Sequence, residues 1–171
     1  MDSSLSSSPR GFVLIEVVAY IAIVSCILVA IGTLTTIVNH ARAKQIVERE
    51  VEDQGRQVLE NILQTVRNSS GIVSPVSGSI EPLLSVTVDS SLASPTTFAL
   101  SEETLNVTEG SAGAVSLTNS SVLVTEFFVQ NLTRGGTPGT IRVHFTLSGT
   151  VTSGSVPFVY SQTFYGAASL R

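Results

Sequence analysis

Residues 12–38, FVLIEVVAYIAIVSCILVAIGTLTTIV, contain a single charged residue, Glu16. From Val17 to Val38 the chain runs for 22 residues without a charge. About 20 apolar residues are enough to cross a bilayer as one helix. A cleaved secretory signal has an apolar run of only ~7–15 residues, which this segment exceeds. The pattern predicts a single membrane-spanning helix over residues 12–38.

Glu16 is an unusual residue in such a segment. A carboxylate near the bilayer centre costs roughly 2.5–3.5 kcal/mol, and less towards an interface, so it requires a partner. On a helix that rises about 1.5 Å per residue, Glu16 lies only ~6 Å along the axis from Phe12. If the chain were cut between Gly11 and Phe12, the new α-amine could pair with the Glu16 carboxylate of a neighbouring subunit. That pairing would favour assembly and set its register.

The sequence RGFVLIE at residues 10–16 resembles the processing site of type IV prepilins and of the pseudopilins of type II secretion systems. The resemblance implies that a prepilin peptidase cuts after Gly11 and that the new amino group of Phe12 is N-methylated. It also implies that Glu16 is the carboxylate used in assembly. Residues 1–11 would then be a leader that is removed from the mature protein.

The same resemblance implies partners and a location. The partners are other pilins or pseudopilins, the prepilin peptidase, an inner-membrane platform protein with an assembly ATPase, and membrane lipid. The protein would be a single-pass protein of the cytoplasmic (inner) membrane, with its leader in the cytoplasm and its distal domain outside. After assembly it would belong to a filament at the cell surface.

Departures from the pattern of major pilins favour a minor subunit. Gly32 and Thr33 replace the proline that many major pilins carry near this point, and the C-terminal cysteine pair of many major pilins is missing. Residues 57–60, leading into residues 72–75, are similar to the J- and W-type minor subunits. The resemblance therefore implies a J- or W-like minor pilin or pseudopilin.

Residues 39–70 contain no proline, and their apolar residues recur every three or four positions, which predicts an amphipathic continuation of the helix to about Asn68. Gly55 is the weak point of this helix, costing up to about 1 kcal/mol relative to alanine. Glu52 and Arg56 have the spacing of an i,i+4 ion pair. The apolar stripe, which we expect to pack on a sheet, consists of Val47, Val51, Val58, Ile62 and Val66, flanked by Leu59 and Leu63.

Residues 71–171 are rich in Ser, Thr, Gly and Val, with alternating stretches between turn signals. We expect one antiparallel sheet packed on the second half of the helix, an α+β architecture that corresponds to the pilin fold. The predicted strands are Leu83–Asp89, Thr96–Leu100, Leu105–Thr108, Ala114–Leu117, Val122–Asn131, Thr140–Thr150 and Pro157–Phe164. The predicted inner face consists of Phe127, Val129, Ile141, Val143, Phe145, Leu147, Val159 and Phe164.

Little in the sequence indicates catalysis. The single cysteine, Cys26, cannot close an intrachain disulfide. His40 and His144 have no Cys, His or carboxylate at metal-ligand spacing, so we expect neither a metal site nor a cofactor. Glu102 and Glu103 are adjacent in a predicted turn, as a solvated pair. The net charge of −4, without a basic cluster, disfavours nucleic-acid binding. We expect a protein that is not an enzyme.

Two functions remain open at this point. The first is a structural, minor subunit of a type IV pilus or pseudopilus-like filament, processed after Gly11 and assembled through its N-terminal helix. The alternative is an uncleaved, membrane-anchored surface binding module or adhesin. The mass of the mature N-terminus distinguishes them, because only the first begins at a methylated Phe12.

Overall fold

The computed structural model describes residues 10–153 and 156–171, and the side chains of residues 14–151 and 157–171. The predicted leader, residues 1–11, therefore lies outside the described residues except for its last two positions. The chain divides into two compact units, Met1–Arg42 and Ala43–Arg171, called here the first and second units. This boundary falls within a helix, close to the position where the sequence changes from apolar to amphipathic.

One helix, α1, spans Arg10–Arg67, which confirms the predicted long helix. Its end lies one residue before Asn68, whose backbone N–H donates to the carbonyl of Gln64 at 3.0 Å. In the first unit the helix is long and apolar enough to cross a membrane, with a mean hydropathy of 2.7 over its most apolar part. None of that part is buried inside the protein.

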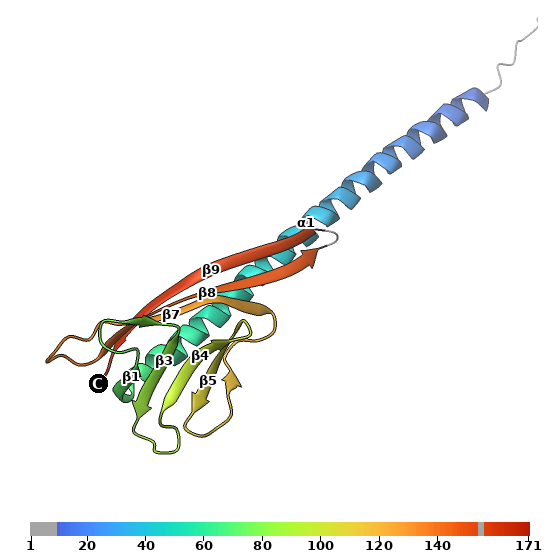
Figure 1. The fold of residues 1–171 in the computed structure, drawn as a ribbon. Helices are drawn as coiled ribbons and strands as arrows, with labels where there is room; N and C mark the ends of the chain where they lie inside the picture. The colour runs from blue at the N-terminus through green and yellow to red at the C-terminus, as the bar shows by residue number, and fades with distance from the viewer. Residues whose placement is uncertain (1–9, 154–155) are drawn as a thin grey trace, which may run out of the picture. The chain divides into compact units, whose positions relative to one another are not determined.

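The second unit contains two antiparallel sheets rather than the single sheet that the sequence predicted (Figure 1). The five-stranded sheet has the order β1-β3-β4-β5-β6, and the four-stranded sheet has the order β2-β7-β8-β9. The bounds in the first sheet are β1 Ser69–Ser74, β3 Leu83–Val88, β4 Thr96–Ser101, β5 Thr104–Glu109 and β6 Val115–Ser116. In the second they are β2 Ile80–Glu81, β7 Val122–Asn131, β8 Thr140–Ser153 and β9 Val156–Ser169.

Strands β1 and β2 are not among the strands that the sequence predicts. The sequence of β1, SSGIVS, has too few apolar residues to show an alternating pattern, and β2 has only two residues. The last strand, β9, continues to Ser169 instead of ending at Phe164, because it pairs with β8 along its whole length. Between β8 and β9, Gly154 and Ser155 lie outside the described residues.

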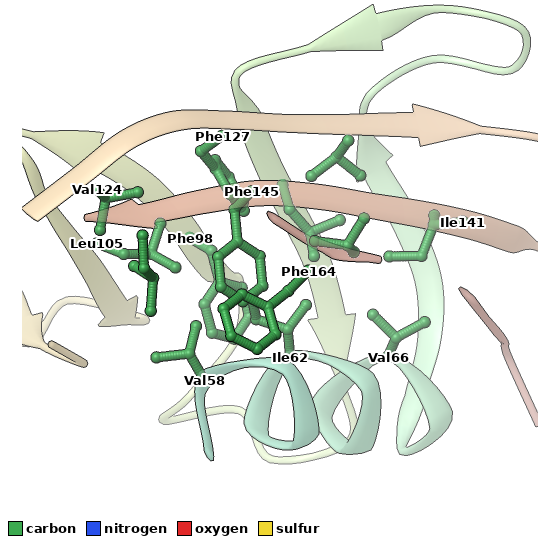
Figure 2. Packing of buried hydrophobic residues seen from close by; sticks show 14 of the residues in the cluster. Val58, Ile62, Val66, Phe98, Leu105, Val124, Phe127, Ile141, Phe145 and Phe164 are labelled. Carbon is green, nitrogen blue, oxygen red and sulfur yellow. The ribbon is translucent and has the colours of Figure 1, made fainter. Parts of the chain in front are cut away.

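A single apolar core fills the second unit and includes residues of α1 and of both sheets. The predicted helix stripe is confirmed, since all five of its valine and isoleucine side chains are buried. Figure 2 shows Val58 and Ile62 pointing from α1 towards Phe145 and Phe164 of the four-stranded sheet. Phe127, Phe145 and Phe164 are register partners across β7, β8 and β9, so they form one aromatic row on the inner face.

The prediction that Val159 lies on the inner face is wrong, since its side chain is 60% exposed. Successive side chains of a strand point to opposite faces, so Val159 and Phe164, five residues apart, cannot share one. Phe164 pairs with Phe145 and is buried, whereas Val159 pairs with Thr150 on the outer face. The even-numbered residues of β9, including Phe158 and Tyr160, provide the inward-facing positions instead.

Glycines allow α1 to lie close to the four-stranded sheet. An added Cβ at Gly55 on the helix would lie 2.1 Å from Cζ of Phe164, so the phenyl ring occupies the place of the missing side chain. On the sheet side, a Cβ at Gly166 would lie 2.7 Å from a methyl group of Leu59. Gly55 is therefore a packing requirement of this interface and not simply the weak point that helix propensity predicted.

The predicted ion pair between Glu52 and Arg56 does not form. Among the residues that the structure describes, the one ion pair joins Lys44 Nζ and Glu48 Oε1 at 3.7 Å. Exposed pairs of this kind contribute only about 0–1 kcal/mol, so neither the helix nor the core depends on which pair forms.

The turn between β4 and β5 is strained. Ser101 and Thr104 are the last paired residues on either side, so Glu102 and Glu103 are the two central residues of the turn. Their φ angles are 50° and 59°. Positive φ at both central positions is typical of a type I′ turn, which strongly prefers Asn-Gly. The turn is held against the other sheet, since Val124 N–H donates to the carbonyl of Glu103 at 2.7 Å.

We expect the double substitution Glu102→Asn with Glu103→Gly to raise the free energy of unfolding by about 1 kcal/mol, because it relieves left-handed strain in two residues. Chemical denaturation of the full chain in lipid nanodiscs would measure the change. The matched control is Glu102→Gln with Glu103→Gln, which removes the same two charges but keeps the strain. If the control stabilises as much as Asn-Gly, charge repulsion and not backbone geometry is the cause.

A small polar cluster joins the two sheets. Ser74 of β1 donates its hydroxyl to Oε2 of Glu81 in β2, and Ser79 donates to Oε1 at 3.1 Å. The hydrogen bond from Ser74 is the largest effect on the carboxyl group and lowers the pKa of Glu81 below its ordinary value. Ser79 adds to this effect, and partial desolvation opposes it.

The lowered pKa of Glu81 predicts a pH dependence of stability. A carboxyl whose pKa is lower in the folded state stabilises the fold above its unfolded-state pKa. That contribution is lost as the pH falls through the lower, folded-state pKa. We expect Ser74→Ala to flatten the acid side of the stability profile, measured by unfolding from neutral pH to below about pH 4. An unchanged acid slope in Ser74→Ala would contradict this role of the hydrogen bond.

Candidate functional site: the start of the long helix

The residues of the predicted processing and assembly site lie on consecutive turns of α1. Gly11 and Phe12 belong to its first turn, and Glu16 follows Phe12 by four residues, about one turn or ~6 Å along the axis. The side chain of Glu16 is exposed, as are the side chains of Leu14 and Ile15 beside it. The helix therefore presents the Glu16 carboxylate outwards, one turn from the predicted new amino terminus.

Glu16 has no hydrogen-bonding or ionic partner among the residues that the structure describes. A carboxylate in an apolar segment needs such a partner to offset its desolvation. After Glu16, the next lysine or arginine of the first unit is Arg42, while Arg10, six residues before Glu16, belongs to the predicted leader. The arrangement therefore leaves a place for a cationic group from another molecule.

The apolar side chains of this segment are exposed along its whole length. Large aliphatic and aromatic side chains from Leu14 at 71% to Val38 at 40% exposure point away from the helix on all sides. A contiguous apolar surface of this size is far larger than soluble monomers expose. It is compatible with a single membrane-spanning helix near the N-terminus.

Three threonines of the same segment form hydrogen bonds with backbone carbonyls of their own helix. The hydroxyl of Thr33 donates to the carbonyl of Ala30 at 2.9 Å, and Thr35 donates to Ile31 at 2.9 Å. Thr36 donates in the same way to Thr33 at 2.8 Å. In hydrocarbon every polar group must find its partner within the protein, because no water is present to supply one. These threonines are therefore compatible with a helix surrounded by lipid.

The other candidate residues lie on different elements of the chain. The structure places Cys26 as a free, exposed thiol on the first unit and His144 on the outer face of the four-stranded sheet. Within residues 10–153 and 156–171, no group of three His, Cys, Asp or Glu residues is placed to hold a metal ion. Glu102 and Glu103 lie in a turn, as predicted.

Comparison of this chain with protein-family models, with characterised proteins and with solved structures finds no match.

Proposed function

We propose that this protein is a structural subunit of a type IV pilus or pseudopilus-like filament, and that it is not an enzyme. It is a minor subunit, cut after Gly11 by a prepilin peptidase and N-methylated at Phe12. The observation that carries the proposal is the exposed carboxylate of Glu16 at the start of an exposed apolar helix, directly after the Gly11–Phe12 sequence. A plain membrane anchor has no need for this carboxylate, which is costly in lipid.

Charge pairing supplies the physical basis for assembly. Two unit charges 4 Å apart attract by about 4 kcal/mol at an effective dielectric constant of 20. A carboxylate at membrane depth costs roughly 2.5–3.5 kcal/mol, so one such pair is large enough to offset it. The cation is the α-amine of Phe12 on the neighbouring subunit. If two helices pack with an axial shift, the Glu16 carboxylate and the Phe12 α-amine do not meet, and both charges stay unpaired. The energetic cost of these unpaired charges sets the register of the helices.

The apolar side chains of the first unit are covered in two different environments, the membrane and the filament. While the subunit is in the membrane, lipid covers the apolar side chains between Leu14 and Val38. In the filament, the same side chains pack on the helices of other pilins or pseudopilins. A platform protein and an assembly ATPase move the subunit between these two environments. The second unit stays outside the cytoplasmic membrane, at the filament surface.

The mature N-terminus tests this proposal. The full chain, produced with a prepilin peptidase and purified from membranes, is expected to begin at N-methylated Phe12 by mass spectrometry. Gly11→Val is expected to keep residues 1–11 and to remain in the membrane. If the wild-type chain retains residues 1–11, or begins after Gly32, the proposal is wrong. Retention of the leader would instead support the membrane-anchored surface module.

A further inference from the structure

The outer face of the four-stranded sheet contains a cavity of about 470 Å³. Its lining comes from β7, β8 and β9, with Ile80 of β2 at its margin. Small-molecule sites are typically clefts of ~300–1,000 Å³ with mostly apolar walls and a few polar groups that fix orientation. This cavity has that composition, and it lies wholly within the second unit.

One wall of the cavity is an aromatic row. Phe128, His144 and Tyr165 are direct register partners across β7, β8 and β9, so their side chains stand next to each other on the same face. The rings of His144 and Tyr165 are nearly parallel, at 2°, with centroids 4.9 Å apart. Phe128 lies 6.1 Å from His144 on the other side. Phe128 and Tyr165 are 41% and 67% exposed, so a ligand can reach this row.

A second row of side chains on the same face of the sheet also lines the cavity and includes its only charged group, Arg142. Gln130, Arg142 and Ala167 are register partners on the same three strands. Ala167 is small and exposed, which leaves the space above it open. Lys44–Glu48 is the single ion pair in the described part of the chain, so Arg142 has no carboxylate partner there. An exposed guanidinium beside apolar rings is well suited to a carboxylate, which it can bind through two parallel hydrogen bonds.

We propose that this cavity binds a planar aromatic group carrying one carboxylate. The outer aromatic row of Phe128, His144 and Tyr165 contacts the flat apolar part of the ligand. Arg142 binds the carboxylate, and Gln130 supplies a further hydrogen bond. The composition disfavours other ligand classes. A nucleic acid needs several cationic contacts, and the lining offers one. A neutral sugar would leave the guanidinium without a partner. This site is independent of the proposed assembly through Glu16.

The two histidines of the chain allow a direct test on the full-length protein in lipid nanodiscs. His144 lies in the cavity, and His40 lies in the first unit, so the imidazole Cε1–H signals of an NMR spectrum report the site and an internal reference. Indole-3-acetate is expected to shift the His144 signal in a saturable way and to leave His40 unchanged. Indole-3-acetamide, which lacks the charge, and acetate, which lacks the ring, are expected to bind at least about tenfold more weakly.

Two variants assign the binding to the cavity. Arg142→Gln is expected to weaken indole-3-acetate by roughly tenfold or more, whereas Arg134→Gln, which removes an exposed arginine outside the cavity, leaves it unchanged. Ala167→Leu fills the open space on the solvent side of the sheet and is expected to abolish binding without affecting the core. Unfolding curves of each variant verify that it remains folded.

The proposal is overturned if millimolar indole-3-acetate causes no saturable shift of His144. It is also overturned if the neutral amide binds equally well, or if Arg142→Gln and Arg134→Gln have the same effect. The same chemistry occurs in free aromatic acids and in polypeptides that end in an aromatic residue. A short peptide ending in phenylalanine that binds more tightly than N-acetyl-phenylalanine identifies a polypeptide as the source, and equal affinities identify the free acid.

Discussion

Gly55→Ala is expected to destabilise the second unit by about 1–3 kcal/mol, even though alanine is the better helix former. Helix propensity alone predicts a gain of up to about 1 kcal/mol. The new methyl group, however, would lie 2.1–2.5 Å from three carbons of the Phe164 ring. That ring is only 8% exposed and is stacked on Phe145, with centroids 5.3 Å apart, so it has little room to move. Overpacking of this kind typically costs about 1–3 kcal/mol, which outweighs the propensity term.

Denaturant unfolding of the full chain in nanodiscs, followed by far-ultraviolet circular dichroism, measures this change. Gly32→Ala is the matched control on the same helix, since nothing lies within 4 Å of its added Cβ. Phe164→Leu alone is destabilising because it removes buried ring surface. Combined with Gly55→Ala, however, it is expected to cost less than the sum of the two single changes, since they share one contact. A neutral or stabilising Gly55→Ala would show that α1 and β9 are not packed as described.

The second large effect is expected for Glu16→Ala, and it rests on the proposed function. This variant should insert into the membrane normally and be cut after Gly11, because alanine is better tolerated in lipid than glutamate. Its incorporation into filaments should fall by roughly tenfold or more. The neighbour's Phe12 amine would then be buried without a counter-charge, and breaking a buried pair typically costs about 3–5 kcal/mol.

Quantitative mass spectrometry of sheared filaments, relative to the membrane pool, measures this incorporation. Glu60→Ala is the matched control, because it removes an exposed carboxylate from the amphipathic part of the same helix. It is expected to incorporate like the wild type. If Glu16→Ala incorporates equally well, the register mechanism is wrong even where the mature protein begins at Phe12. The N-terminal mass and the incorporation therefore test cleavage and pairing separately.

The sequence alone determined the features that depend on neighbouring residues. The uncharged run from Val17 to Val38 predicts a membrane-spanning helix, because length and hydropathy are properties of one continuous segment. The amphipathic stripe, including Val51 and Ile62, follows from the 3.6-residue period of the helix and is buried as predicted. The position of Glu16 one turn after Phe12 is equally local, since it requires only helical geometry.

Only the tertiary structure decided the features that depend on register between distant strands. It divided the strands between two sheets, turned Val159 outwards, and brought Phe128, His144 and Tyr165 into one row beside Arg142. A strand's own pattern shows which residues alternate but not which residues of another strand they face. The packing of Phe164 over Gly55 has the same origin, because its two partners lie more than 100 residues apart and meet only when the sheet packs on the helix.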